Sequence, residues 1–146
     1  MNLTTSAAGR MLIMEHEGFR ATPAPLPQGG WVVGYGHVRK DAPGARVTRA
    51  EATRLLGDDL RPFERMVGAS VQTPLTQAQF DALVSFAFSV GMEAFAASQV
   101  LRRVNGGDIL AAACALDAWR KSDASGELEI VDALVRRRAA EKAMLL

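Results

Sequence analysis

The chain has 146 residues, the size of one domain that can bury a hydrophobic core of its own. Its hydrophobic content of 49% and charged content of 23% exclude a disordered or fibrous protein. The net charge of +1, from 17 basic and 16 acidic residues, disfavours binding to nucleic acid or to an anionic surface through overall charge. We expect one globular domain over residues 1–146, with no nucleic-acid partner.

The first predicted element is a helix that carries Glu17 at its C-terminal edge. Its apolar residues lie three and four positions apart, hydroxyl residues stand near its start, and Gly18 follows its end. The apolar run in this helix is too short to be a secretory or membrane segment, so the residues as given predict a cytoplasmic location. The apolar positions are Leu3, Ala7, Met11 and Met14.

A small β lobe is predicted after this helix, over residues 19–40. The helical period is lost there, and the prolines and glycines of the stretch do not fit inside a helix. Pro23, Pro25 and Pro27 alternate, which places missing amides on one side of a strand. This pattern predicts an edge strand or a polyproline-like arm rather than a central strand.

An all-helical lobe is predicted from Thr48 to the C-terminus. Thr48 with Glu51, and Thr76 with Gln79, have the spacing of capping boxes. Pro62 is predicted to kink or split the first helix of this lobe. The helices are expected to run from Thr48 to about Val67, from Thr76 to Gly91, over 98–105, over 109–120 and over 130–144, with a polar loop over 121–126. The predicted class is therefore α+β.

Few residues offer metal or redox chemistry. Cys114 is the single cysteine and is predicted to be a small core residue. His16 and His37 have no cysteine partner, so we expect no metal and no cofactor. The basic run from Arg136 to Arg138 is predicted to be a solvated or ion-paired helix face.

Two parts of the sequence resemble the phage-type lysozymes, the endolysins of glycoside hydrolase family 24. The first is a Glu-Gly-x-Arg motif at Glu17, followed by Gly29-x-Trp31 and Val33-Gly-Tyr-Gly-His37. The second is a set of C-lobe signatures over 75–91, 98–108, Trp119 and 134–141. The resemblance covers nearly the whole chain and implies a lysozyme-like fold with an N-terminal helix, a small β lobe and a larger helical lobe.

The same resemblance locates the catalytic positions. The family uses a Glu, an Asp or Cys and a Thr, and these positions fall on Glu17, Leu26 and Val32. Glycoside hydrolysis needs an acid and a second group, with two carboxyls about 5 to 9.5 Å apart. Leu26 and Val32 provide no such group, and residues 18–40 contain no Asp or Glu. Glu17 is the retained acid, and little or no hydrolysis is predicted.

The residues around the lost positions favour contact with protein. Apolar side chains stand where sugar and water are bound in the family, which suits a protein interface. The predicted cleft or interaction surface comprises Pro25, Leu26, Trp31, Val32 and His37. More narrowly, the pattern resembles the degenerate muramidase-like domains of a family of bacterial cell-polarity scaffolds. That resemblance implies a sensor histidine kinase as partner, self-association, and membrane association through a segment outside these residues.

Three alternatives stay open. In the first, the chain is an active endolysin that cleaves the MurNAc-GlcNAc β-1,4 bond with Glu17 as acid. In the second, it is a module that binds the peptidoglycan glycan strand without cleaving it. A structural role for Glu17 is the third, as an ion-pair partner of Arg136, Arg137 or Arg138. Trp31 and Trp119 also fit as packing aromatics, and His37 as a hydrogen-bonded turn residue.

Overall fold

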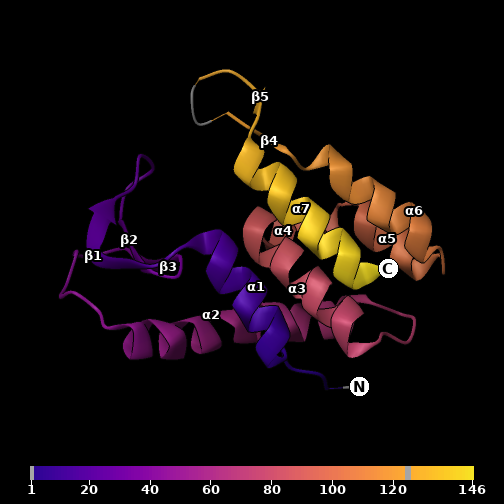
Figure 1. Cartoon of the computed structure of the whole chain (residues 1–146), viewed down its shortest axis with the longest axis horizontal. Helices are drawn as coiled ribbons and strands as arrows, with labels where there is room; N and C mark the ends of the chain where they lie inside the picture. Colours follow the sequence, from indigo (N-terminus) through magenta and orange to yellow (C-terminus); the bar gives the residue numbers. More distant parts are fainter. Residues whose placement is uncertain (1, 124–125) are drawn as a thin grey trace.

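The computed structural model describes residues 2–123 and 126–146. It combines helices with two small antiparallel sheets, which confirms the α+β class (Figure 1). In chain order the elements are α1 (Ala7–Glu17), β1 (Arg20–Pro25), β2 (Trp31–Gly34), β3 (His37–Arg39), α2 (Arg49–Ser70), α3 (Gln77–Val90), α4 (Met92–Ala96), α5 (Gln99–Asn105), α6 (Ile109–Ala115), a short 3₁₀ helix (Leu116–Ala118), β4 (Lys121–Ser122), β5 (Glu129–Ile130) and α7 (Asp132–Leu145).

The elements separate into two lobes that α1 and α2 connect (Figure 1). The sheet β1–β2–β3 lies at the left over one end of α2, and the remaining helices gather around α3 at the right. This is the predicted arrangement of an N-terminal helix, a small β lobe and a larger helical lobe. The part of the chain that the structure describes contains no helix that is long and apolar enough to cross a membrane.

Helix α1 begins after the predicted hydroxyl residues, and its buried face differs in part from the predicted one. Ser6 caps it by accepting a hydrogen bond from the amide of Gly9. The predicted apolar stripe is confirmed in part, because Leu3 and Met14 pack against the core. Met11 is 68% exposed, however, and the fully buried positions of the helix are Gly9 and Ile13. The reason is close packing at a glycine, since a Cβ at position 9 would lie 2.6 Å from Cγ of Asp81 in α3.

Helix α2 is continuous through Pro62, so the predicted split does not occur. Pro62 lies on the exposed side of the helix, where the carbonyl group that loses its hydrogen bond can meet water. The helix turns one apolar face to the core, where Ala52, Leu56 and Leu60 are all buried. The helix runs on past Gly68 to Ser70 and there ends beside the core.

The β lobe is a three-stranded sheet in which β1 is an edge strand, as its prolines predict. Residues that pair across antiparallel strands share a face of the sheet. Val33 pairs with His37 on the face toward α2, where Val33 is fully buried. Ala24, Val32 and Val38 pair on the opposite face. We call this second face the outer sheet face.

Helix α3 is the centre of the helical lobe. Its capping box at Thr76 and Gln79 forms as predicted, and its residues 80–87 are all buried. Trp119 packs edge-on against Phe86, with ring centroids 5.5 Å apart. Cys114 is exposed, so its predicted core position is wrong. The alanines of α6 give no apolar period, and Cys114 lies one turn from the exposed Leu110.

The last segment before α7 differs from the prediction. A two-stranded hairpin of β4 and β5 forms where the sequence predicts a polar loop followed at once by a helix. Residues 124 and 125 of that predicted loop lie outside the described residues. Helix α7 therefore begins at Asp132, two positions later than expected.

Candidate active site

Glu17 lies at the C-terminal end of α1, where the chain turns into the β lobe. Gly18 makes this turn with φ of +75°, a conformation that L side chains rarely adopt. A surface pocket of about 460 Å³ opens beside the carboxylate and is lined by residues 17–22. The Glu17 side chain is 21% exposed, so it reaches this pocket while keeping a partner inside the protein.

The inner partner of Glu17 is Arg137 of α7. Nη1 of Arg137 donates to Oε2 of Glu17 at 2.5 Å, and Nη2 donates to the backbone carbonyl of Ser85 at 3.1 Å. On its other side the carboxylate meets Gly36, where a Cβ would lie 2.6 Å from Oε1 of Glu17. The ion pair predicted for Glu17 is thus confirmed, with the second arginine of the basic run as its partner.

The ion pair continues into a buried network between α3 and α7. Glu141 accepts hydrogen bonds from Nε of Arg137 at 3.4 Å, from Oγ of Ser85 at 2.5 Å and from Nη1 of Arg138. Burial lowers the pKa of the Arg138 guanidinium, and the adjacent Glu141 carboxylate opposes that shift. Two carboxylates face two guanidiniums, so the network is balanced in charge. The basic run is ion-paired at Arg137 and Arg138 rather than solvated.

Leu26 and Val32 do not line the pocket of Glu17. Leu26 lines a separate pocket of about 410 Å³ with Gln28, Gly29, Gly30, Val38 and Lys40. Val32 lies on the outer sheet face, between Ala24 and Val38. Both residues therefore belong to the β lobe, and Leu26 lines a hollow that does not include Glu17.

The other residues of the predicted surface lie apart from Leu26 and Val32. Pro25 and Trp31 pair with each other next to the pair of Ala24 and Val32, so their side chains lie on the sheet face toward α2 and not on the outer sheet face. His37 lies against α2, where its Nδ1 is 2.8 Å from Oδ2 of Asp59. The structure thus divides the predicted set, because Val32 belongs to the outer sheet face and Leu26 lies just beyond β1, in a pocket that it shares with Val38 of that face.

Sequence reasoning missed two residues near these positions. The hydroxyl residue Thr22 lines the pocket of Glu17, although it stands at no motif position. Val38 lies on the outer sheet face and is 48% exposed. Side chains alternate between the two faces of a strand, and Val32 and Val38 lie on the two strands that flank the Gly-Tyr-Gly-His turn. This pattern could have indicated that Val38 shares a face with Val32. Of the residues that line the Glu17 pocket, only Glu17 carries a carboxylate.

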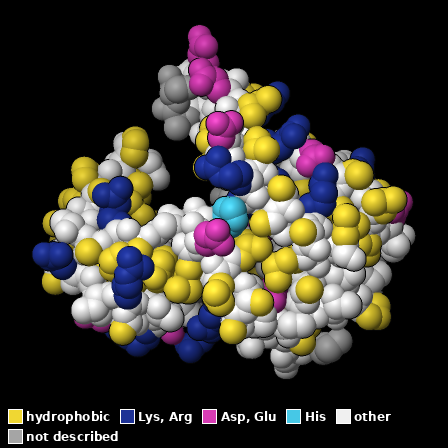
Figure 2. All heavy atoms as spheres, viewed as in Figure 1, with side chains coloured by type: hydrophobic (Ala, Val, Ile, Leu, Met, Phe, Trp, Pro, Cys, Tyr) yellow, Lys and Arg dark blue, Asp and Glu magenta, His cyan; other side chains and the backbone are white. Residues whose placement is uncertain are grey.

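A notch separates the β lobe from the upper part of the helical lobe. Figure 2 shows it on the upper side of the molecule, between the lobe of β1–β3 and the segment that carries β4, β5 and the start of α7. Apolar side chains are exposed on both of these parts of the molecule. Val38 lies on the β lobe, whereas Leu128 and Ile130, 68% and 60% exposed, belong to the hairpin segment.

Comparisons with known proteins show the family and the fold of this chain. The family model described as phage lysozyme matches residues 14–141. An endolysin of Acyrthosiphon pisum secondary endosymbiont phage 1 is 34% identical, with 95% of each chain covered. An endolysin of Bacillus phage PZA is 37% identical over 95% of this chain, which spans about half, 54%, of that protein. The muramidase domain of SpmX from Asticaccaulis excentricus is similar in structure with a TM-score of 0.93, at 48% identity, covering 98% of this chain and 97% of that one.

Proposed function

We propose that this chain, which belongs to the phage lysozyme family, has little or no muramidase activity and serves as a protein-interaction domain that self-associates. One observation carries the proposal. The carboxylate of Glu17 is held by Arg137, and no second carboxylate stands among the residues that line its pocket. An acid without a nucleophile or base completes only half of a glycosidase reaction.

The size of the expected loss supports an interaction role. Removing a positioned base costs about 10² to 10⁴-fold in rate, and removing electrostatic stabilisation costs about 10² to 10³-fold. Leu26 cannot accept a proton or stabilise an oxocarbenium ion, and Val32 has no hydroxyl group to orient water. The Thr22 hydroxyl can hold a water molecule beside Glu17 but is too weak a base to activate it.

The outer sheet face supports the proposed role in protein contact. Its side chains are apolar, and Val38 is half exposed although it is a valine on a strand. Exposed apolar surface of this kind favours contact with another protein over contact with sugar. We propose Leu26, Val32 and Val38 as the centre of the contact, with a second copy of the domain or a sensor histidine kinase as the partner.

The similarity to the SpmX muramidase domain is compatible with either kind of partner. The more distant similarity to endolysins supports peptidoglycan, the substrate of the family, as a candidate ligand of this chain. An active endolysin is the second candidate function, and the observation that favours it is the exposure of Glu17 to a pocket that also holds Thr22. A glycan-binding module without hydrolysis is the third.

Light scattering of the purified chain over a range of concentrations tests self-association. We expect a mass that rises with concentration in the unmodified chain and stays at the monomer value in Val38→Asp, because a carboxylate on the outer sheet face opposes its burial in an interface. Leu110→Asp is the matched control, since Leu110 is 65% exposed on α6, away from the β lobe. If the unmodified chain stays a monomer at high concentration, or if Val38→Asp and Leu110→Asp reduce self-association equally, this contact is contradicted.

A further inference from the structure

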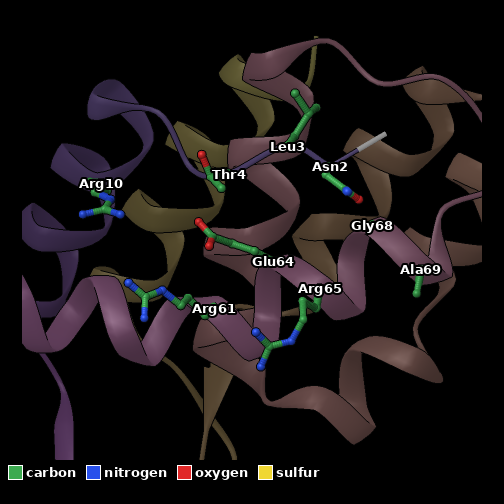
Figure 3. Close-up of a pocket in the computed structure, with 9 residues that line it drawn as sticks. All are labelled: Asn2, Leu3, Thr4, Arg10, Arg61, Glu64, Arg65, Gly68 and Ala69. Carbon is green, nitrogen blue, oxygen red and sulfur yellow. The ribbon is translucent and has the colours of Figure 1, made fainter.

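Another hollow lies away from Glu17, between the N-terminal segment and α2 (Figure 3). Its volume is about 580 Å³, and one wall is the N-terminal segment of residues 2–4 with Arg10 of α1. The other wall is one side of α2, with residues 61, 64, 65, 68 and 69. None of these residues belongs to the catalytic positions of the family or to the outer sheet face.

Three arginines give this hollow a positive charge. Arg10 comes from α1, and Arg61 and Arg65 come from α2 (Figure 3). Arg61 pairs with Asp58 at 3.1 Å, but both side chains are at least half exposed, so this pair is weak. Within residues 2–123 and 126–146, the guanidinium groups of Arg10 and Arg65 have no ion-pair or hydrogen-bond partner. Their guanidinium groups are therefore available to a ligand.

One carboxylate lies among these arginines, but it is already in use. Oε2 of Glu64 accepts hydrogen bonds from the amide and from the hydroxyl group of Thr5, both at 2.6 Å. The residue is only 7% exposed. Glu64 thus holds the N-terminal segment against α2, and its burial limits how strongly it can repel an anionic ligand.

The charged hollow continues into an apolar one. A second pocket of about 290 Å³ shares Leu3 and Gly68 with the first. Its other lining residues are Val71, Gln72, Thr73, Pro74, Leu75 and Phe80. We call the two pockets together the N-terminal groove. It offers guanidinium groups at one end and aliphatic and aromatic side chains at the other.

The backbone along this groove favours an extended ligand. In the described part of the chain, the backbone of Asn2 and Leu3 makes no hydrogen bond, and both residues lie outside any helix or strand. Backbone without hydrogen-bond partners can bind an extended segment through main-chain hydrogen bonds. A free phosphate would use the guanidinium groups but neither the apolar end nor this backbone.

We propose that the N-terminal groove binds an extended peptide that carries carboxylates next to an apolar side chain. The carboxylates meet Arg10 and Arg65, and the apolar side chain enters the pocket at Pro74 and Leu75. Guanidinium groups match carboxylates in geometry as well as in charge. This surface would give the domain a partner site independent of the outer sheet face.

Fluorescence anisotropy with a labelled peptide tests this proposal. The probe is a short peptide in which a run of glutamates is followed by leucines, and the comparison peptides replace glutamate by lysine or leucine by serine. We expect saturable binding that weakens with salt, and weaker or no binding of both comparison peptides. The double variant Arg10→Gln with Arg65→Gln should weaken binding about tenfold, since two partly exposed ion pairs are lost.

Two further variants separate the groove from general charge. Arg54→Gln is the matched control, because Arg54 is exposed on α2 and lines neither pocket. It should leave the affinity unchanged. Gly68→Leu keeps every charge and fills the junction of the two pockets, so it should weaken binding. Thermal unfolding of each variant confirms that it is folded.

Several results would overturn the proposal. Equal affinity of the double arginine variant and Arg54→Gln would exclude a role for the groove. Displacement of the peptide by inorganic phosphate at equal concentration would indicate a simple anion site. Binding to phosphatidylglycerol vesicles that requires Arg10 and Arg65, without binding of the peptide, would indicate a membrane contact instead.

Discussion

Arg137 donates a hydrogen bond from Nη1 to Oε2 of Glu17 at 2.5 Å, and so joins α7 to the end of α1. These two residues are 120 positions apart in the sequence. The carboxylate that we propose as the counterpart of the family's acid is therefore also the outermost member of a buried network that holds α1, α3 and α7 together. A structural role accounts for its retention without any need for catalysis.

The interior of this network should dominate the stability of the helical lobe. Arg138→Gln leaves Glu141 buried with fewer compensating charges, and a change of this kind typically lowers the free energy of unfolding by about 3 to 5 kcal/mol. Arg136→Gln is the matched control, because the adjacent Arg136 is exposed and should change stability by less than about 0.5 kcal/mol. Urea denaturation measures both, and similar unfolding midpoints for the two variants would contradict the role assigned to the network.

Gly36 should be more sensitive to a methyl group than Gly29. Both have positive φ, of +80° and +97°, so alanine costs about 1 to 2 kcal/mol of backbone strain at either position. A Cβ at position 36 also meets Oε1 of Glu17 at 2.6 Å, whereas nothing lies within 4 Å of one at position 29. Thermal unfolding should show Gly36→Ala as the less stable variant. Equal melting temperatures would mean that Glu17 moves aside freely.

Local signals account for most of the fold that could be predicted. The capping-box spacings at Thr48 and Thr76 mark the starts of α2 and α3, because each hydroxyl group accepts a hydrogen bond from an amide of the first turn. The reciprocal side-chain bond of a full capping box is formed at Thr76. Alternating prolines predicted the edge strand β1 for a similarly local reason. The buried face of α1 could not be predicted, since it depends on Gly9 packing against Asp81 of a distant helix.

In the candidate site, too, some features could be predicted from the sequence and others could not. The position of Glu17 follows from its motif, and its pairing with the basic run of α7 could be expected from charge alone. The separation of Leu26 from the Glu17 pocket could not be predicted, because it depends on how the hairpin of β1 and β2 folds. The register of these strands shifts between Arg20 and Ala24, an irregularity that sequence alternation does not reveal.

Restoring the lost side chains should not restore hydrolysis. Leu26→Asp with Val32→Thr supplies the missing groups, but Leu26 lines a pocket that does not include Glu17. We expect less than a tenfold gain over the unmodified chain in the release of reducing sugar from peptidoglycan, against the factor of about 10² to 10⁴ that a positioned base provides. A gain of that larger size would show that side chains alone, and not the shape of the β lobe, abolish activity.

Clearing of a suspension of purified cell walls, followed by turbidity, tests the central claim most directly. The unmodified chain and Glu17→Gln are compared at equal concentration, with an active phage lysozyme as the positive control and circular dichroism to verify folding. We predict that both chains leave the turbidity unchanged while the control clears it. Clearing by the unmodified chain that disappears in Glu17→Gln would identify Glu17 as a working catalytic acid and contradict the proposed loss of muramidase activity.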